Sequence, residues 1–373
     1  MKKRQNLNYV KGLFLILWFS TLHASLYPLD CAFLPDAGQC KSHDTGSPSN
    51  FFASLDFLYW EGMERGLEYA LKNTASSLDQ KIEVFEPDFG FHPAFRVGLG
   101  THLGDDEWGV RFFYTRYYTA NNAHTAHLFN GNDQSGIRSV WTSPSAFQGN
   151  SFRSYWQHSN ADWKLHTHVV DLFLQHGFCI SPRISLDPGF GLTFAIIQQR
   201  LDVLYEEGNR AFAVDGSGTP IQFISSQIAM KNRSFNLGMG AKMNVKWNFS
   251  EPFDCIGSLS GSLLASQFTV GRNEWDVSSD PMHGVLLESF RENDDYWTLR
   301  PAASLLLGFG WNGCICKPKH VVYYSVSAAY ELHVFWKQNM LLRFIDQANA
   351  AMIVPSLGDL FFHGLTLQGL IDF

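Results

Sequence analysis

Charged residues are scarce in this chain, and no apolar run is long enough to cross a membrane as a helix. Asp, Glu, Lys and Arg make up 17% of the 373 residues, against about 25% in an ordinary soluble domain. The mean hydropathy is nevertheless close to neutral, at -0.11. These values exclude a helical membrane protein, which needs stretches of about 20 apolar residues.

Several motifs of catalysis and binding are also missing. The sequence contains no G-x-S-x-G, no H-E-x-x-H and no phosphate-binding loop. His124 and His127, like His166 and His168, lack a Cys or carboxylate partner at metal-ligand spacing. We therefore expect no enzyme, no cofactor and no bound metal, although a catalytic set assembled in space from distant residues stays open.

Aromatic residues are abundant instead. They form 15% of the chain, including 32 Phe, and glycine contributes 31 residues. A transmembrane β-barrel has this composition, because half of its strand residues face lipid and half face water. The alternative that composition leaves open is a secreted soluble β protein. The net charge of -7 argues against a nucleic-acid partner, since such partners require basic surfaces.

The N-terminus has the layout of a secretory signal peptide. Lys2, Lys3, Arg4 and Lys11 precede and flank the short apolar run from Gly12 to Phe19. We expect cleavage near Ala24 or Ser25, so residues 1–25 form the signal. Residues 26–50 are then a periplasmic N-terminal segment and residues 51–373 a barrel in the bacterial outer membrane.

Long stretches of strict alternation are the main evidence for this barrel. In residues 235–249 every second side chain is apolar, and the residues between them are small or polar. Successive side chains of a strand point to opposite faces, so one face is apolar and the other is wet. These strands exceed the usual length of about 5 or 6 residues in globular proteins.

The alternation predicts an all-β, transmembrane, antiparallel up-and-down barrel of about ten strands. The expected strands are residues 51–60, 95–103, 108–118, 163–178, 184–196, 235–249, 255–269, 297–311, 320–336 and 360–373. Short and long connections alternate between them, which predicts short periplasmic turns and long extracellular loops.

Two details of this strand assignment are less regular. A further hairpin around residues 221–228 would raise the strand number to twelve or more. The fourth strand changes parity near Val169 and Val170, so keeping Asp171 away from lipid requires a β-bulge there.

The charged residues on the predicted water face are the candidate working residues. Rings of such charges tune ion passage in pores. The alternative is that they pair with one another and fill the lumen. The pore-lining candidates are Arg96, Arg111, Lys242, Lys246, Arg300, Asp56, Asp187 and Glu331.

The last strand ends in an aromatic residue. Phe373 shares one face with Ile371 and Gly369. This ending resembles the signal by which the barrel-assembly machinery recognises outer-membrane proteins. We expect that machinery and the outer-membrane lipid to be partners of the chain.

Three stretches resemble the Legionella-type pore-forming major outer-membrane protein family, which has members in chlamydia-like bacteria. The opening from Phe52 to Glu61, the hairpin containing Phe95, Asp106 and Trp108, and the ending from Gly364 to Gly369 carry the likeness. The resemblance implies a porin-like or major surface protein and no catalytic residue. We therefore predict passive diffusion of small hydrophilic solutes and ions. The alternative is a structural or adhesive surface barrel that acts through its long loops without an open channel.

All six cysteines fall at the predicted periplasmic end. They are Cys31, Cys40, Cys179, Cys255, Cys314 and Cys316. The oxidising periplasm allows thiols to pair, and Cys255 can reach Cys314 only if their turns approach. We expect disulfides along this rim, within the chain or to other envelope proteins; cross-linked envelopes are what the chlamydia-like resemblance implies. Small, buried, reduced cysteines are the alternative, and a homo-oligomer stays open.

Overall fold

The computed structural model describes residues 51–372 apart from 74–81, 104–107, 128–135, 143–154, 209–211, 215–219, 251, 279–286, 318–319 and 345–352. The expected signal peptide (residues 1–25) and N-terminal segment (residues 26–50) lie outside the described residues. In the described part of the chain, no helix is long and apolar enough to cross a membrane.

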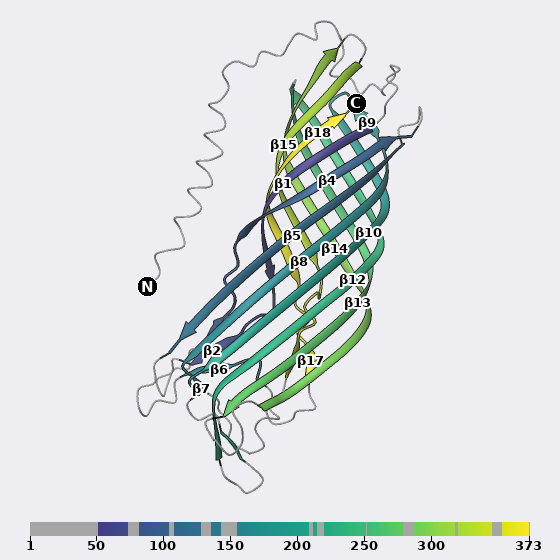
Figure 1. Cartoon of the computed structure of the whole chain (residues 1–373). Coiled ribbons are helices and arrows are strands. Elements are labelled where there is room, and N and C mark those ends of the chain that lie inside the picture. The colour runs from purple at the N-terminus through teal and green to yellow at the C-terminus, as the bar shows by residue number, and fades with distance from the viewer. Residues whose placement is uncertain are drawn as a thin grey trace.

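Ten antiparallel strands close into one barrel, as the alternation predicts (Figure 1). Each strand pairs with its neighbours along the chain, and the last strand pairs with the first. The strands are β1 (Phe51–Glu64), β4 (Phe91–His102), β5 (Trp108–Ala126), β8 (His158–His176), β10 (Ile184–Glu206), β12 (Pro220–Ser250), β13 (Phe253–Ser278), β14 (Leu287–Lys317), β15 (His320–Phe335) and β18 (Leu360–Asp372).

The two ends of the barrel differ in their connections. Short connections join the strands at one end, which we call the turn end, where Phe52 pairs with Asp372. Long connections lie at the other end, the loop end. The alternation of short and long connections is therefore confirmed. The alternative of a further hairpin in the barrel wall is not realised, because residues 221–228 lie within β12. The short β11 (Phe212–Val214) pairs with the first residues of β12.

The described residues contain eight further short strands beside the ten of the barrel wall. At the turn end, β9 (Phe178–Ser181) pairs with β10. The others belong to the connections at the loop end, where Figure 1 shows β2, β6 and β7 together. They are β2 (Ala70–Asn73), β3 (Ile82–Phe85), β6 (Ile137–Ser139), β7 (Tyr155–Trp156), β11 (Phe212–Val214), β16 (Leu342–Phe344) and β17 (Ile353–Pro355).

A belt of large apolar side chains surrounds the barrel on its outside. Met239, Trp297 and Phe309 are 74%, 73% and 66% exposed. We call this belt the apolar band; on β12 it runs along the outward residues from Phe235 to Phe249. A soluble protein does not expose so much contiguous apolar surface. Closed antiparallel strands with this band form the architecture of a transmembrane β-barrel.

The polarity of both faces reverses toward the loop end. On β10 the outward side chains are apolar up to Ile196 and then become polar at Gln198 and Arg200. The inward side chains become apolar at the same place, so that Leu201 and Tyr205 are fully buried. Ile196 pairs with Phe235, and Gln198 pairs with Arg233. The polarity of β12 therefore reverses at the same level as that of β10.

This reversal replaces the bulge expected in β8. The register of β8 with β5 and with β10 is continuous through Val169 and Val170, so the expectation of a bulge is wrong. Asp171 points inward and accepts a hydrogen bond from Thr193 Oγ1 at 2.7 Å. Farther along the same strand Trp163 is inward and fully buried. Odd and even residues of β8 therefore keep their faces along the strand. What changes toward the loop end is that the inner face becomes apolar and the outer face becomes polar.

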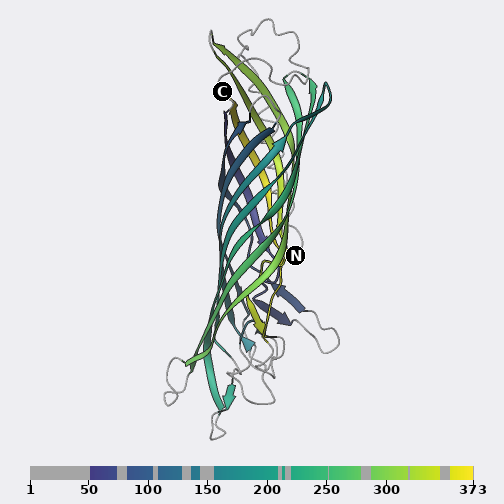
Figure 2. The ribbon, with the colours of Figure 1, turned by 90° about the vertical axis from the view of Figure 1, so that its right-hand side faces the viewer.

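The reversal also explains why several strands are longer than expected. Both β12 and β14 contain 31 residues. The expected strands began at 235 and 297, where the outward apolar residues begin. Beyond those points the backbone pairing continues with polar residues outside, and Figure 2 shows the tall, narrow barrel that results.

We predict that Met243→Lys destabilises the folded barrel in lipid vesicles by roughly 2–4 kcal/mol, because Met243 lies near the middle of the apolar band of β12. The matched control is Asn244→Lys, whose side chain points inward and should be tolerated. Urea unfolding in vesicles measures both, and equal losses would contradict the facing of this strand.

Candidate functional site in the barrel lumen

All eight charged residues predicted to line a pore lie on the inner face. Their parity matches that of inward neighbours in each strand. Most of them pair with one another or with further inward residues. Mutual pairing inside the lumen is the alternative to a ring of free charges.

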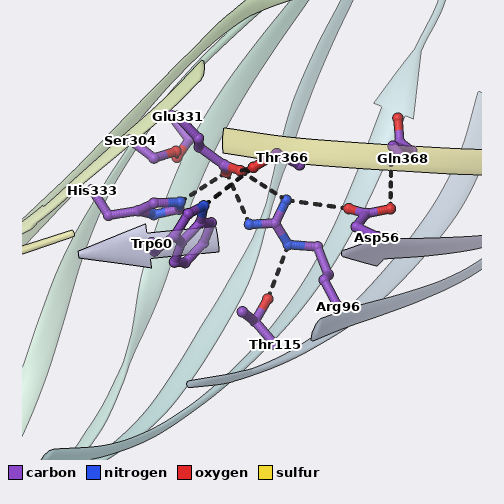
Figure 3. Close-up of polar contacts among 10 residues, drawn as sticks. Asp56, Trp60, Arg96, Thr115, Ser304, Glu331, His333, Thr366 and Gln368 are labelled. Carbon is purple, nitrogen blue, oxygen red and sulfur yellow. Dashed lines mark hydrogen bonds and ion pairs between the residues drawn. The ribbon is translucent and has the colours of Figure 1, made fainter. Parts of the chain in front are cut away.

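Arg96 is the centre of the largest network (Figure 3). Its two terminal nitrogens donate to the carboxylate of Glu331 at 2.9 and 3.2 Å. Nη1 also lies 3.4 Å from Asp56 Oδ2, and Nε donates to Thr115 Oγ1 at 3.0 Å. Bidentate contacts of this kind are the strongest that a guanidinium makes with carboxylates.

The two carboxylates have further partners. Glu331 accepts from Thr366 Oγ1 at 2.8 Å and contacts His333 Nε2 at 2.8 Å. Asp56 accepts from Gln368 Nε2 at 3.0 Å. Trp60 Nε1 donates to Thr366 Oγ1 at 3.2 Å and extends the network.

This network crosses the seam where the barrel closes. Asp56 lies on β1, Gln368 on β18, Glu331 on β15 and Arg96 on β4. These four strands are consecutive around the barrel, with the β18–β1 closure in their middle. The ion pairs therefore bind the first and last barrel strands together from the inside, beneath the apolar band.

A small cavity lies beside the network. Its volume is about 70 Å³, which holds a few water molecules. The polar lining includes Arg96, Asp171, Thr193, Ser304 and His333, and the apolar lining includes Phe335 and Phe362. The cavity is thus a wet pocket in the lumen with groups for ions and hydrogen-bonding solutes.

The remaining charges are distributed along the lumen. Lys246 Nζ lies 2.9 Å from Asp254 Oδ2, and Arg111 lies 4.0 Å from Asp187. Lys242 Nζ lies 5.1 Å from the centre of the Phe113 ring. Among these groups three cations face two anions, and Lys242 has an aromatic ring in place of a carboxylate.

Inward glycines bring the wall strands together. Gly238 and Gly308 lie on the inner face of β12 and β14. A Cβ built on Gly238 would lie 1.9 Å from the carbonyl oxygen of Leu263, and one on Gly308 would lie 2.4 Å from that of Ala328. A side chain at either position would therefore collide with the backbone of the neighbouring strand.

Segments of three loop-end connections fold inward and pack against the apolar inner wall. We call residues 65–73, 136–142 and 338–344 the plug. Leu67, Ile137, Trp141 and Leu341 are fully buried and belong to one apolar cluster with wall residues such as Trp163. The plug therefore occupies the lumen at the loop end.

Inward polar side chains of the wall hold the plug. Arg272 on β13 is fully buried; it donates to the carbonyl oxygens of Leu342, at 2.8 Å, and Trp141, and pairs with Glu274 at 2.9 Å. Tyr205 Oη donates to Tyr69 O at 2.5 Å.

Two amide side chains complete this attachment. Asn232 Nδ2 donates to Gln338 O at 2.8 Å. Within the plug, Asn339 Nδ2 donates to Arg65 O at 2.9 Å and so joins two of its segments. The plug is thus attached to β10, β12 and β13 and cross-linked internally.

The histidines do not form a metal centre in the described part of the chain, where no group of three or more His, Cys, Asp or Glu residues is arranged to hold an ion. His166 and His168 point outward from β8. His124 stacks on His158 with ring centres 5.7 Å apart.

Three cysteines lie at the turn end, where they were expected. Cys179 is on β9, Cys255 near the start of β13 and Cys314 near the end of β14. Cys255 has a free thiol and points outward, whereas Cys314 points inward, so these two cysteines do not pair with each other. Cys31, Cys40 and the side chain of Cys316 lie outside the described residues, and disulfides at this rim stay a prediction.

The final strand has the facing that an assembly signal requires. Gly369 and Ile371 are exposed on the outer face of β18, and Phe373 lies outside the described residues. Recognition by assembly machinery stays a prediction.

Sequence reasoning missed Arg272, His333 and the plug. His333 shares the face of Glu331 two residues earlier, so parity alone could have identified it. Arg272 continues the alternation of β13 beyond the expected strand end. The plug has no comparable periodicity, because its segments are held by contacts distant in sequence.

No protein-family model and no curated protein matches this chain, so membership of the Legionella-type family stays a prediction. Among solved structures, the outer-membrane protease OmpT of Escherichia coli is similar at 12% identity and a TM-score of 0.36, covering 88% of this chain and 99% of that one. The toluene transporter TodX of Pseudomonas putida is similar at 9% identity and a TM-score of 0.30, covering 87% of this chain and 90% of that one.

We predict that Arg96→Met lowers the free energy of unfolding by about 3–5 kcal/mol, because it leaves Asp56 and Glu331 buried without their cation. Urea unfolding in vesicles measures the loss. Replacing Arg96, Asp56 and Glu331 together by apolar residues should restore most of it. Exposed Lys337→Met is the control, and a loss below about 1 kcal/mol for Arg96→Met would contradict a locking role.

Proposed function

We propose that this protein is an outer-membrane barrel that passes small hydrophilic solutes and ions passively, and that its plug governs this passage. The turn end then faces the periplasm and the loop end faces the exterior of the cell. The proposal assigns it no catalytic activity and no cofactor.

One observation carries this proposal: a closed wall is apolar outside and polar inside at the same depth. On β12 the outward residues from Phe235 to Phe249 are apolar, while Lys242, Asn244 and Lys246 point inward. The apolar side chains of the band can contact lipid, which offers no hydrogen bonds. The polar side chains on the inner face need water or polar partners in the lumen. A transport path is the use that this division of faces supports best.

The plug sets the condition for passage. The cavity beside Arg96 borders Phe335 and Phe362, which belong to the apolar cluster that includes the plug. A hydrated ion cannot cross such a packed apolar layer without high cost. Solutes therefore pass only when the plug segments move away from the wall.

A second candidate is a surface barrel that acts structurally or adhesively through its loop end. Two observations favour it: the wall extends beyond the apolar band with polar residues outside, and the lumen there is packed. In this case the plug is a permanent core that stiffens an exposed platform.

Planar-bilayer recording on two variants separates these candidates. In the first, residues 339–357 are replaced by a short Gly-Ser turn. The ends are suited to this, because Phe335 pairs with Leu360 and Lys337 N donates to Asp359 Oδ1 at 2.8 Å. The matched control replaces only residues 345–352 by Gly and Ser and retains residues 338–344.

We predict rare, small conductance steps for the unchanged protein and for the control, and larger, long-lived steps for the shortened variant. The reason is that the shortened variant loses Met340, Leu341 and Leu342, which are buried in the lumen. Insertion without conductance in all three proteins would overturn the pore proposal and favour the surface barrel.

A further inference from the structure

Five basic side chains gather on the outer face just beyond the apolar band. They are exposed and lie on four consecutive strands, β5, β8, β10 and β12. We call this set the basic patch; it consists of Arg116, Lys164, Arg200, Lys231 and Arg233.

The strand register makes the patch contiguous. Lys164 pairs with Arg200, and Arg200 pairs with Lys231. Arg233 lies one outward position closer to the band than Lys231, opposite Gln198. Arg116 lies at the near edge, opposite His168. Directly paired side chains of neighbouring strands are about 5 Å apart at Cβ, so several of these cations can contact one ligand.

The patch contains no outward acidic residue over its three levels on β5, β8, β10, β12 and β13, all of which the structure describes. The first acidic neighbours are one level farther toward the loop end, where the outward Asp162 and Asp202 lie opposite each other on β8 and β10. Asp202 forms an ion pair with Arg200 at 2.6 Å. Two strands beyond each edge of the patch the outward residues are acidic, with Asp295 on β14 and Glu61 on β1. The excess of positive charge is therefore confined to one side.

The basic patch contacts the edge of the apolar band. The Arg233 guanidinium lies 4.4 Å from the centre of the Phe235 ring, which is the first apolar outward residue of β12. Beside it, Tyr118 contacts His166 with ring centres 4.3 Å apart, and Tyr114 Oη contacts His168 Nδ1 at 2.9 Å. Aromatic and long basic side chains at this height are typical of a lipid headgroup region.

We propose that the basic patch binds the phosphate groups of an anionic glycolipid in the outer leaflet. This inference rests on the proposed outer-membrane location. Guanidinium and ammonium groups recognise phosphate strongly. The apolar band below would hold the acyl chains of the same molecule, so one lipid would contact both surfaces.

The test compares two charge-neutralised variants in neutral phosphatidylcholine vesicles that contain bisphosphorylated or dephosphorylated lipid A. The first variant is Lys164→Gln, Lys231→Gln and Arg233→Gln. The matched control is Arg65→Gln, Arg291→Gln and Lys337→Gln, which removes the same charge from exposed positions at the loop end outside the patch. Lipid retained by the protein is quantified after extraction, and urea-resistant insertion is measured first.

We predict that the unchanged protein and the control retain the phosphorylated lipid in preference to the dephosphorylated one. The patch variant should lose about a hundredfold in affinity for the phosphorylated form, since each basic residue near an anionic surface contributes about one kcal/mol.

Three results would overturn the inference: no preference for phosphate, an equal loss in the control, or tighter patch-dependent binding of soluble heparin than of lipid A. Insertion without a preference for phosphate would contradict lipid binding by the patch and leave the proposed membrane location standing. Failure to insert into any vesicle would contradict both.

Discussion

The closed ladder of backbone hydrogen bonds is the constraint on which the rest of the structure depends. A wall strand in lipid has no water to satisfy its amides, so every strand needs a partner on both sides. β18 supplies the last partner by pairing with β1 from Phe52 to Glu64. Beneath that seam, Arg96, Asp56 and Glu331 join the same strands through side chains, so that closure and the polar lumen are stabilised by one set of contacts.

A second consequence of the ladder is a fixed side-chain parity along very long strands. On β10, and on β12 from Ser225 onward, the odd and even residues keep their faces. The surroundings change instead: beyond Ile196 and Phe235 the outside is polar and the inside is apolar. One continuous strand therefore builds a wet lumen at the turn end and a packed core at the loop end, where the plug completes the core.

Much of this fold could be predicted from the sequence, because period-two alternation records facing directly. All ten barrel strands, the order of short and long connections and the inward facing of the eight charges followed from it. The strand ends did not, because the alternation with apolar residues outside stops at the edge of the apolar band while the backbone pairing continues. The expected bulge near Val169 is wrong for the same reason: it lies where the polarity reverses within an unbroken strand.

The contents of the lumen were harder to predict. Arg96 and Glu331 are 235 positions apart in the sequence, and alternation gives facing without giving partners. The plug depends on backbone carbonyls such as those of Trp141 and Leu342, which accept from Arg272; no residue type marks such acceptors. The opposite facing of Cys255 and Cys314 follows from the alternation, once β14 is continued beyond its expected end at residue 311.

A spin-label scan of outward positions on β12 tests the central claim most directly. Labels at residues 229, 231, 233, 235, 237, 239, 241 and 243 would be compared in vesicles for collision with oxygen, which partitions into lipid, and with a water-soluble nickel complex. The account predicts access to the nickel complex up to Arg233 and access to oxygen from Phe235 onward, with no change of phase between odd and even positions. Access to the nickel complex along the whole strand, or a switch of phase within it, would contradict it.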